Sequence, residues 1–417
     1  MRTDWDVVVV GAGLAGLAAG ATAAAGGAAT VVLEAAQPGG RARTVAKGPY
    51  VFNMGSHALY LGGPGTAVLR RLGIRPDGVP SPFPDYKLLK DGAIHTVPSG
   101  PGSVLRTTAL SKAGKAQFAR LFALLPLLKA SRLGGTSVRQ WIEDHNLRPD
   151  TAAVARTLIR LSTYTADVDE FSADAAIRQL QIGARPGVVY LHGGWTQLIT
   201  GLAAKVEVQT KAKVQRVEPG AGRVEIYTGD EMVTARQVIV AAGTPAAVRA
   251  VLPEDPGWGE MGAPVTGACL DLGLTRVPQP GYLLGVDEPV MGVTQSPPAR
   301  QAPEGHAVVS AIRYGATDAD ADRLALDGHV ARLGVKAVDI AQSRFLARMV
   351  VAGSTPRAND GGLAGRPRVT DSGQPGVYIA GDWVGPEGLL ADASLASGHQ
   401  AARSALDRLE QSPALVA

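Results

Sequence analysis

The sequence predicts an α/β protein in which a discontinuous, Rossmann-like dinucleotide-binding domain carries an inserted α+β domain. Three observations predict this fold. The chain opens with a β-branched strand, a glycine-rich turn, a helix and a second strand that ends in an acidic residue. It closes, from residue 377, with a short apolar strand, a glycine, a carboxylate and a helix. The long middle reads first as mainly helical and then as mixed strands and helices, which is typical of an insertion.

The opening strand leads into a turn that suits a phosphate group. Val7–Val10 is short, apolar and β-branched, as in a buried parallel strand. Three glycines follow in the Gly-x-Gly-x-x-Gly spacing. Gly11 allows the tight turn, Gly13 lets a pyrophosphate approach the backbone, and Gly16 lets the next helix pack against the strand.

A helix and a second strand complete this unit. The helix is predicted over Leu14–Ala25, so Leu14 and Ala15 present backbone N–H groups to a diphosphate at its N-terminus. The apolar run Thr30–Leu33 ends in Glu34, at the distance where the motif needs an acceptor for a ribose hydroxyl. Together these features predict a dinucleotide site.

The turn Gly39-Gly40-Arg41 indicates which dinucleotide binds. Here the chain resembles the flavin-binding superfamily of amine oxidases, phytoene desaturases and protoporphyrinogen oxidases, in which Gly-Gly-Arg follows the ribose carboxylate. The resemblance implies a glutathione-reductase-type domain with non-covalent FAD, and it places Arg41 near the FAD diphosphate. The planar, permanently charged guanidinium suits a phosphate group.

The end of the chain resembles the closing motif of the same family. A strand from Val377 reaches a glycine and a carboxylate, and a helix is predicted over about 392–409. The N-terminus of that helix can face the flavin pyrimidine oxygen, where negative charge develops on reduction. The resemblance assigns four residues here to the cofactor: Gly381, Asp382, Ala393 and Ser394.

Four more cofactor positions follow from the resemblance. A strand that starts at Pro49 enters the cofactor site and is followed by Gly55 and Ser56. Val214, in a predicted strand over Lys213–Val217, matches the residue whose backbone meets the adenine ring. Gly243 follows a further strand of the same sheet.

Periodicity, capping residues and turns predict the remaining elements. Predicted helices cover Ser111–Ala123, Thr136–His145, Asp150–Thr163, Ala173–Ile182, the stretch from Trp195 to about 204, and Asp320–Leu333. Further predicted strands cover Glu207–Gln209, Arg223–Tyr227, Gln237–Val240, Val265–Leu274 and His306–Tyr314.

The length of 417 residues and the apolar content of 46% suit two or three domains. The FAD-binding domain is predicted over 1–75, 188–255 and 370–417. The substrate-binding domain is predicted over 76–187 and 256–369.

Composition argues against several other classes. The net charge of +4 comes from mixed charges, with no basic run that would predict a nucleic-acid partner. The single cysteine, Cys269, excludes an internal disulfide framework, and no spacing of ligands predicts a metal. No signal peptide is evident, and the apolar stretch 7–33 belongs to the nucleotide unit, so a cytoplasmic location is expected.

No second glycine fingerprint is followed by a strand and an acidic residue, so a built-in NAD(P)H site is not expected. The electron acceptor is then oxygen, a quinone or another protein.

The residues before the closing helix bear on the substrate. Amine oxidases of the superfamily usually carry a tyrosine there, as part of an aromatic cage, whereas this chain has Leu389, Leu390 and Ala391. This favours oxidation of a C–C or C–O bond in a fairly apolar small molecule, such as an isoprenoid or another secondary metabolite. Three alternatives stay open: a flavoenzyme without net redox change (an isomerase or cyclase), an amine oxidase, and a non-catalytic binding protein on the same scaffold.

Five side chains are candidates for the catalytic pocket. His57 is either an acid/base group or a structural histidine that holds a loop. Tyr190 and Trp195 either line the pocket or pack in the core. Arg313 ends a predicted strand and either anchors a substrate carboxylate or lies on the surface. Leu390 is expected to form an apolar wall beside the flavin.

The stretch Phe118–Lys129 is the most apolar outside the sheets. It is either a helix that roofs the substrate cavity, kinked at Pro126, or a segment that contacts a membrane surface. The first interpretation is favoured because the charges do not form one face.

Overall fold

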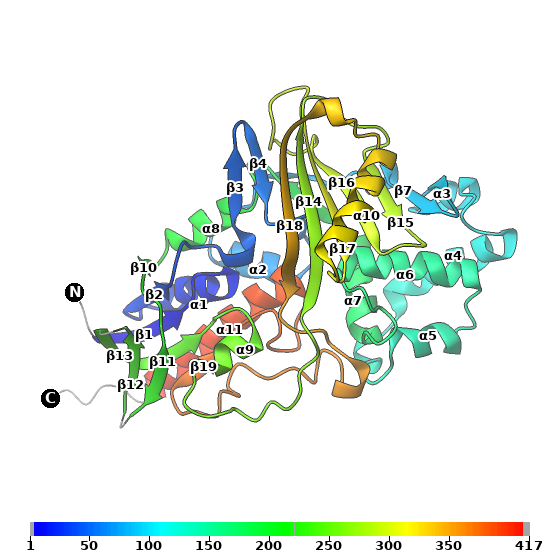
Figure 1. Ribbon diagram of the computed structural model, residues 1–417. Coiled ribbons are helices and arrows are strands. Elements are labelled where there is room, and N and C mark those ends of the chain that lie inside the picture. The colour runs from blue at the N-terminus through cyan, green and yellow to red at the C-terminus, as the bar shows by residue number, and fades with distance from the viewer. Residues whose placement is uncertain (1–3, 221, 230, 412–417) are drawn as a thin grey trace.

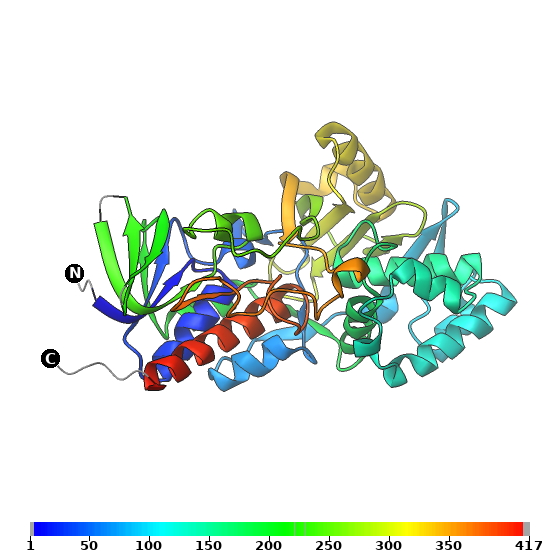
Figure 2. The same cartoon turned by 90° about the horizontal axis from the view of Figure 1, so that it is seen from below.

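The computed structural model of the chain describes residues 4–220, 222–229 and 231–411. Figures 1 and 2 show two large sheets side by side, each covered by its own helices. The first strand and the end of the last helix lie at the same end of the elongated molecule (Figure 1). This arrangement brings distant parts of the sequence together between the two sheets.

The first sheet is the predicted nucleotide-binding sheet. Its strand order is β10-β2-β1-β13-β12-β11, and β19 pairs with β13 in parallel. The pairs β1–β2, β1–β13 and β10–β2 are also parallel. Its strands are β1 (Asp4–Val10), β2 (Thr30–Glu34), β10 (Glu207–Thr210), β11 (Arg216–Pro219), β12 (Val224–Thr228), β13 (Glu231–Val240) and β19 (Val377–Ile379).

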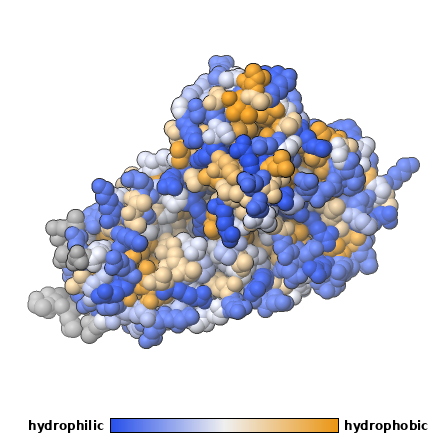
Figure 3. Space-filling model, in the orientation of Figure 1, coloured by the Kyte–Doolittle hydropathy of each residue, from blue (hydrophilic) through white to orange (hydrophobic). Residues whose placement is uncertain are grey.

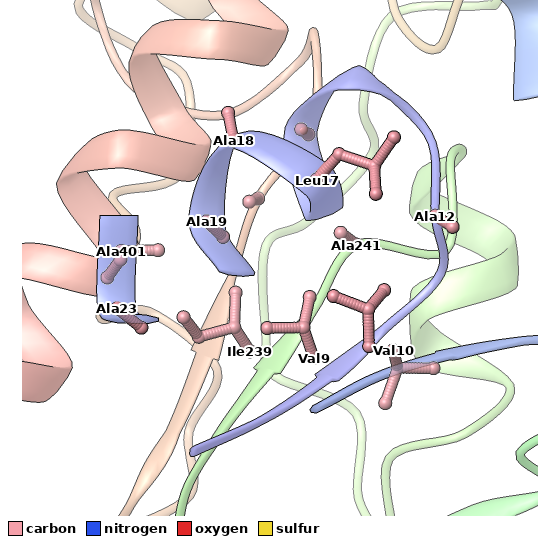
Figure 4. Packing of buried hydrophobic residues seen from close by; sticks show 14 of the residues in the cluster. Val9, Val10, Ala12, Leu17, Ala18, Ala19, Ala23, Ile239, Ala241 and Ala401 are labelled. Carbon is pink, nitrogen blue, oxygen red and sulfur yellow. The ribbon is translucent and has the colours of Figure 1, made fainter. Parts of the chain in front are cut away.

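Small residues let two helices lie close to this sheet. α1 (Leu14–Ala25) has the predicted bounds and packs against α11 (Leu390–Gln411). Figure 4 shows Ala19 and Ala23 of α1 near Ala401 of α11, with Val9 and Ile239 of the sheet below them. These side chains are fully buried.

Two glycines are required by this close approach. A Cβ atom on Gly16 would lie 1.8 Å from the carbonyl oxygen of Gly11. A Cβ atom on Gly398 would lie 2.1 Å from the carbonyl oxygen of Ala15. The predicted role of Gly16, close packing of helix on strand, therefore has a direct steric basis.

The second sheet has the order β18-β14-β17-β16-β15-β7-β8 and is crossed by α10 (Ala319–Arg332). Its strands are β7 (Lys87–Lys90), β8 (Ala93–Thr96), β14 (Val265–Leu274), β15 (Tyr282–Gly285), β16 (Val290–Ser296), β17 (Ala307–Tyr314) and β18 (Ile340–Ala352). The sequence did not predict β7, β8, β15, β16 or β18. Figure 3 shows apolar residues at the top of the visible face, over the turn between α10 and β18.

A helical layer lies beside the second sheet (Figure 1). It consists of α3 (Pro101–Arg106), α4 (Lys112–Leu124), α5 (Val138–Asp144), α6 (Pro149–Thr163) and α7 (Ala173–Ala184). Pro126 does not kink a longer helix, as the sequence suggested. α4 ends at Leu124, and Pro126 lies in the short 3₁₀ turn Leu125–Leu127 that follows.

Smaller elements connect these layers. β3 (Thr44–Lys47) and β4 (Tyr50–Asn53) form a hairpin, and β5 (Leu59–Tyr60), β6 (Gly78–Pro80) and β9 (Val188–Leu191) form a three-stranded sheet. The short helices are α2 (Pro64–Arg71), α8 (Thr196–Ala203) and α9 (Pro245–Arg249).

Candidate active site

One large cavity, of about 2940 Å³, lies at the carboxyl ends of β1, β2 and β13 and extends to α3, α4, α6 and α7. Pockets for a single small molecule usually measure about 300–1,000 Å³. The cavity is therefore large enough for a dinucleotide and a second, sizeable ligand. In open α/β sheets this edge is where ligands bind.

The phosphate-binding turn lies at one end of the cavity. Gly11 has φ of 97° and lies close to the end of the neighbouring strand β13. A Cβ atom on Gly11 would lie 2.6 Å from the carbonyl oxygen of Ala241. Gly13 caps α1, and no atom lies within 4 Å of the position of its missing Cβ. α1 has no capping side chain and no acidic residue in its first turn. Leu14 and Ala15 line the cavity there, and this cradle fits a diphosphate.

Glu34 lies next to this turn, as the motif requires. Its Oε2 accepts a hydrogen bond from the backbone N–H of Ala12 at 2.7 Å, and its Oε1 accepts one from Ala36 at 2.9 Å. Each carboxylate oxygen can accept a further bond. Glu34 lines the cavity and is therefore placed to accept a ribose hydroxyl.

Arg41 and Asp382, which the sequence assigned separately to the cofactor, form a bidentate ion pair. The Arg41 Nη1 and Nη2 atoms lie 2.7 and 2.8 Å from the two Asp382 oxygens. Nη1 also donates to the carbonyl oxygen of Val351. Two of the five guanidinium N–H groups are left for a phosphate. Gly39 and Gly40 adopt positive φ in the preceding turn, as a close chain reversal requires.

His57 is held between two backbone carbonyl groups. Its Nδ1 lies 3.0 Å from the oxygen of Gly55, and its Nε2 lies 3.2 Å from the oxygen of Arg41. Its ring meets that of Trp195 edge-on, with centroids 4.9 Å apart. Burial lowers the pKa of His57, although its two backbone hydrogen bonds raise it. The neutral imidazole donates to only one of the two carbonyl groups. These contacts favour the structural role for His57.

A buried network that the sequence did not indicate fixes the 53–57 segment. The Asn53 amide donates to Gln295 at 3.1 Å and accepts the backbone N–H of Trp195 at 3.0 Å. Gln295 donates to the Ser56 hydroxyl at 3.2 Å and to the carbonyl oxygen of His57 at 3.1 Å. Gln295 belongs to β16, whose polar C-terminal end and central glycine hid it as a strand in the sequence.

An ion pair in the second sheet supports the same segment. Arg344 of β18 pairs with Asp271 of β14 at 2.6 Å and donates to the carbonyl oxygen of Asn53. Asp271 also accepts a hydrogen bond from Ser310 at 2.6 Å. The second sheet therefore positions the loop that follows β4.

The closing segment places Leu390 in the cavity wall. Leu390 has φ of 54°, a conformation that costs energy for a non-glycine residue, and it begins α11. The Ser394 hydroxyl donates to its carbonyl oxygen at 3.1 Å. Gly381, Asp382, Leu390 and Ser394 line the cavity, whereas Ala393 is buried behind it.

Tyrosine rings form another part of the wall. The hydroxyl groups of Tyr190 and Tyr86 are hydrogen-bonded to each other, and Tyr86 stacks on Tyr282 with centroids 4.9 Å apart. The Tyr164 hydroxyl donates to the carbonyl oxygen of Ser56 at 3.1 Å. Burial raises the pKa of Tyr190, so its phenol is neutral at physiological pH.

The remaining predicted residues fall into two groups. Val214 and Gly243 line the cavity, although Val214 precedes β11 instead of lying within a strand. Gly55 has φ of 89° and packs against Met349 behind the wall. Arg313 does not line the cavity. Its Nε lies 2.8 Å from the buried Asp322, which α10 brings to β17, so it is not placed to anchor a substrate.

No cluster of histidine, cysteine or acidic side chains suited to a metal ion occurs among the described residues. Within the same part of the chain, no helix is both long and apolar enough to cross a membrane.

Comparison with known proteins agrees with this geometry. The sequence profile of the family described as flavin containing amine oxidoreductase matches residues 14–263. No curated protein sequence gives a match.

Solved structures share the fold along nearly the whole chain. An oxidoreductase from Methanosarcina mazei superimposes with a TM-score of 0.73 at 19% identity, covering 96% of this chain and 100% of its own. Cyclohexylamine oxidase from Brevibacterium oxydans gives 0.73 at 19% identity, covering 98% and 100%. A candidate protoporphyrinogen oxidase from Exiguobacterium sp. 255-15 gives 0.71 at 17% identity, covering 97% and 99%.

Proposed function

The chain belongs to the family of flavin-containing amine oxidoreductases and is therefore an FAD-dependent oxidoreductase. We propose that it oxidises a C–C or C–O bond of a fairly apolar small molecule. An isoprenoid or a similar secondary metabolite is the substrate class that we favour. Bound FAD supplies the hydride acceptor, and the protein supplies binding, orientation and exclusion of water.

The observation that carries this proposal is the wall of the cavity beyond the cofactor turn. It is built from aliphatic and aromatic side chains of α3, α4, the 3₁₀ turn that follows α4, α6, α7 and β16. They include Val104, Phe118, Leu121, Leu125, Leu158, Leu161, Ile177, Leu180, Ile182, Met291 and Val293. Such a wall selects a substrate by shape and buried apolar area.

The charges along the cavity oppose a cationic amine. Among the described residues, Glu34, Asp382 and Asp392 are the only acidic side chains that line it. The substrate end instead carries Lys112, Lys115, Arg178 and Arg185. A like charge disfavours approach of a polyamine, whereas a neutral or anionic substrate is not repelled.

The test is turnover of amines against apolar alcohols and polyenes. We expect no peroxide release with benzylamine or spermine. Leu390→Asp places a charge in the apolar wall, so it should impair oxidation of an apolar substrate at least about tenfold while leaving the FAD content unchanged. Leu390→Asn is the matched uncharged control, because asparagine tolerates positive φ. Efficient oxidation of spermine would show that the protein is an amine oxidase and would contradict the proposed substrate class.

For the electron acceptor we propose oxygen, a quinone or another protein. NADH and NADPH should not reduce the flavin rapidly under nitrogen, because the described strands offer one glycine fingerprint, that of β1 and α1. Rapid bleaching by either nucleotide in a stopped-flow experiment would show a second site.

The charge pattern of 118–129 alone favoured a cavity roof over membrane contact, but the exposed apolar side chains of the structure support both, and we further propose that the substrate enters from an anionic membrane surface. Residues 92–142 contain seven arginine and lysine residues and no acidic residue. In the same segment Leu105 and Leu127 are each 75% exposed, and Phe122 and Leu124 are partly exposed. Leu105 and Phe122 also line the cavity, so this surface lies at its mouth. An apolar patch among cations suits anionic lipid headgroups.

Co-sedimentation with vesicles tests this route. Binding should be stronger to vesicles with anionic phospholipid than to neutral ones, and Leu105→Glu with Leu127→Glu should weaken it. Leu324→Glu, at a 75% exposed leucine on α10, is the matched control. Equal binding of the double variant and the control would exclude this surface.

A further inference from the structure

The side-chain amides of Asn53 and Gln295 form a hydrogen-bonded chain whose direction is fixed by the backbone. Asn53 Oδ1 accepts the backbone N–H of Trp195 at 3.0 Å, so Asn53 Nδ2 is the atom that faces Gln295 Oε1, at 3.1 Å. Gln295 Nε2 then lies 3.1 Å from the carbonyl oxygen of His57, which can only accept. Neither amide can be turned over without placing two donors or two acceptors face to face.

Ser56 stands at the end of this chain. Gln295 Nε2 lies 3.2 Å from Ser56 Oγ, and because an amide nitrogen can only donate, Ser56 Oγ accepts this bond. Within the described part of the chain, no hydrogen bond uses the proton of the Ser56 hydroxyl group. Ser56 lines the cavity and is partly exposed, whereas Asn53 and Gln295 are 3% and 1% exposed. The chain therefore leaves the Ser56 hydroxyl group as a donor toward the cavity.

Ser56 lies where the cofactor end of the cavity meets the substrate end. On one side, Nε2 of the next residue, His57, lies 3.2 Å from the carbonyl oxygen of Arg41, whose guanidinium group pairs with Asp382. On the other side, the hydroxyl group of Tyr164, at the end of α6, donates to the carbonyl oxygen of Ser56 at 3.1 Å. Hydride transfer requires the substrate to touch the flavin ring, so the ring belongs at this junction.

We propose that Gln295 is a positioning residue that fixes the Ser56 hydroxyl group as a hydrogen-bond donor to a carbonyl oxygen of the flavin ring. A donor with a fixed direction suits an atom that accepts in both redox states, as a ring carbonyl oxygen does. A ring nitrogen that takes up a proton on reduction would instead need a partner that accepts. The inference depends on bound FAD and not on the proposed substrate class.

Such a donor makes the flavin easier to reduce. Reduction adds negative charge to the ring, and a hydrogen bond to a charged acceptor is stronger than one to a neutral acceptor. The hydroxyl group therefore favours reduced over oxidised flavin, and its loss should lower the midpoint potential. Because Gln295 belongs to β16, the second sheet would help to set the potential of a cofactor whose diphosphate binds at the first sheet.

The test measures the midpoint potential of the FAD-loaded enzyme under nitrogen, by equilibrium reduction with a reference dye and without substrate. Ser56→Ala should reduce the preference for reduced over oxidised flavin about tenfold, which is about 30 mV for a two-electron couple. Gln295→Met removes the amide chain and should lower the potential in the same direction. The double variant Ser56→Ala/Gln295→Met should match Ser56→Ala alone, because Gln295 acts through the Ser56 hydroxyl group.

Thr294→Val is the matched control. Thr294 is the neighbour of Gln295 in β16, is 1% exposed, and donates its hydroxyl hydrogen bond to the carbonyl oxygen of Gly281 at 2.8 Å. This variant loses one buried hydrogen bond away from the 53–57 segment, so its potential should equal that of the wild type. Ser56→Ala keeps the test decisive if Gln295→Met folds poorly, because Ser56 is partly exposed.

Each contrary result has a distinct meaning. An unchanged or raised potential in Ser56→Ala would overturn the contact with a ring carbonyl oxygen, and an unchanged potential with a higher Michaelis constant would assign the hydroxyl group to the substrate instead. If the effects of Ser56→Ala and Gln295→Met add in the double variant, Gln295 does not act through Ser56. None of these results bears on the apolar substrate, which the amine and alcohol assays test separately.

Discussion

The ion pair between Arg41 and Asp382 predicts a strong thermodynamic coupling between two segments far apart in the sequence. Asp382 is 2% exposed, and besides Arg41 it accepts only the backbone N–H of Gly353, at 3.0 Å, among the described residues. Arg41→Met would remove the ion-pair partner of this buried carboxylate and leave the buried guanidinium of Arg366 as the nearby positive charge. The variant therefore tests whether Arg41 supports the site or serves the diphosphate alone.

The structure sets the size of this effect. Breaking a buried pair by removing one partner costs about 3–5 kcal/mol. The side chain of Arg41 is 36% exposed, so water screens part of the interaction. We therefore expect Arg41→Met to lower the free energy of unfolding by about 3 kcal/mol, at the lower end of this range. The double variant Arg41→Met/Asp382→Asn should recover about 2 kcal/mol of the summed losses.

Urea unfolding measures this coupling, with tryptophan fluorescence as the signal, since Trp383 is buried next to Asp382. Free FAD is held at one concentration, and its dissociation constant is measured for each variant, because a bound ligand adds to stability. If the two single effects instead add within about 0.5 kcal/mol, Arg41 and Asp382 are not coupled.

Further predictions concern the cofactor and a buried carboxyl group. Glu34→Ala should weaken FAD binding by about 1.5–3 kcal/mol, measured by equilibrium dialysis, and unchanged affinity would count against its ribose contact. Acid or heat should release FAD, and flavin that stays with the precipitated protein would show a covalent link. Burial raises the pKa of Asp392 to about 7, so the folded protein keeps a proton that the unfolded chain releases above about pH 4. The protonated carboxyl group therefore makes its full contribution to the free energy of unfolding below about pH 4, and this contribution falls as the pH rises to about 7. Asp392→Asn should flatten this slope in urea unfolding, and an identical slope would contradict the burial argument.

Local sequence patterns predicted the nucleotide-binding unit well, because its requirements are local. The turn at Gly11 and Gly13, the helix Leu14–Ala25 and the position of Glu34 beside that turn follow from steric and hydrogen-bonding needs within a short segment. The closing strand and helix followed from a motif of the same kind. The sequence also predicted an apolar wall at Leu390, and Leu390 lies in the wall of the cavity.

The elements that the sequence missed depend on tertiary contacts. β18 carries arginine and glutamine among its apolar residues and lies at the edge of its sheet, so it shows no simple alternation. Arg41 and Asp382 are 341 residues apart, and no local pattern links them. Gln295 and Arg344 contact the 53–57 segment from the second sheet, far away in the sequence, so no local pattern predicts these contacts.

Anaerobic titration of the FAD-loaded enzyme, followed at the flavin absorption band, tests the proposed reaction class most directly. We predict that an apolar compound with an oxidisable C–C or C–O bond bleaches the band, whereas benzylamine and spermine do not. Bleaching by the amines would contradict the assignment of substrate class. A compound that is converted while the band stays oxidised throughout would instead indicate a flavoenzyme without net redox change.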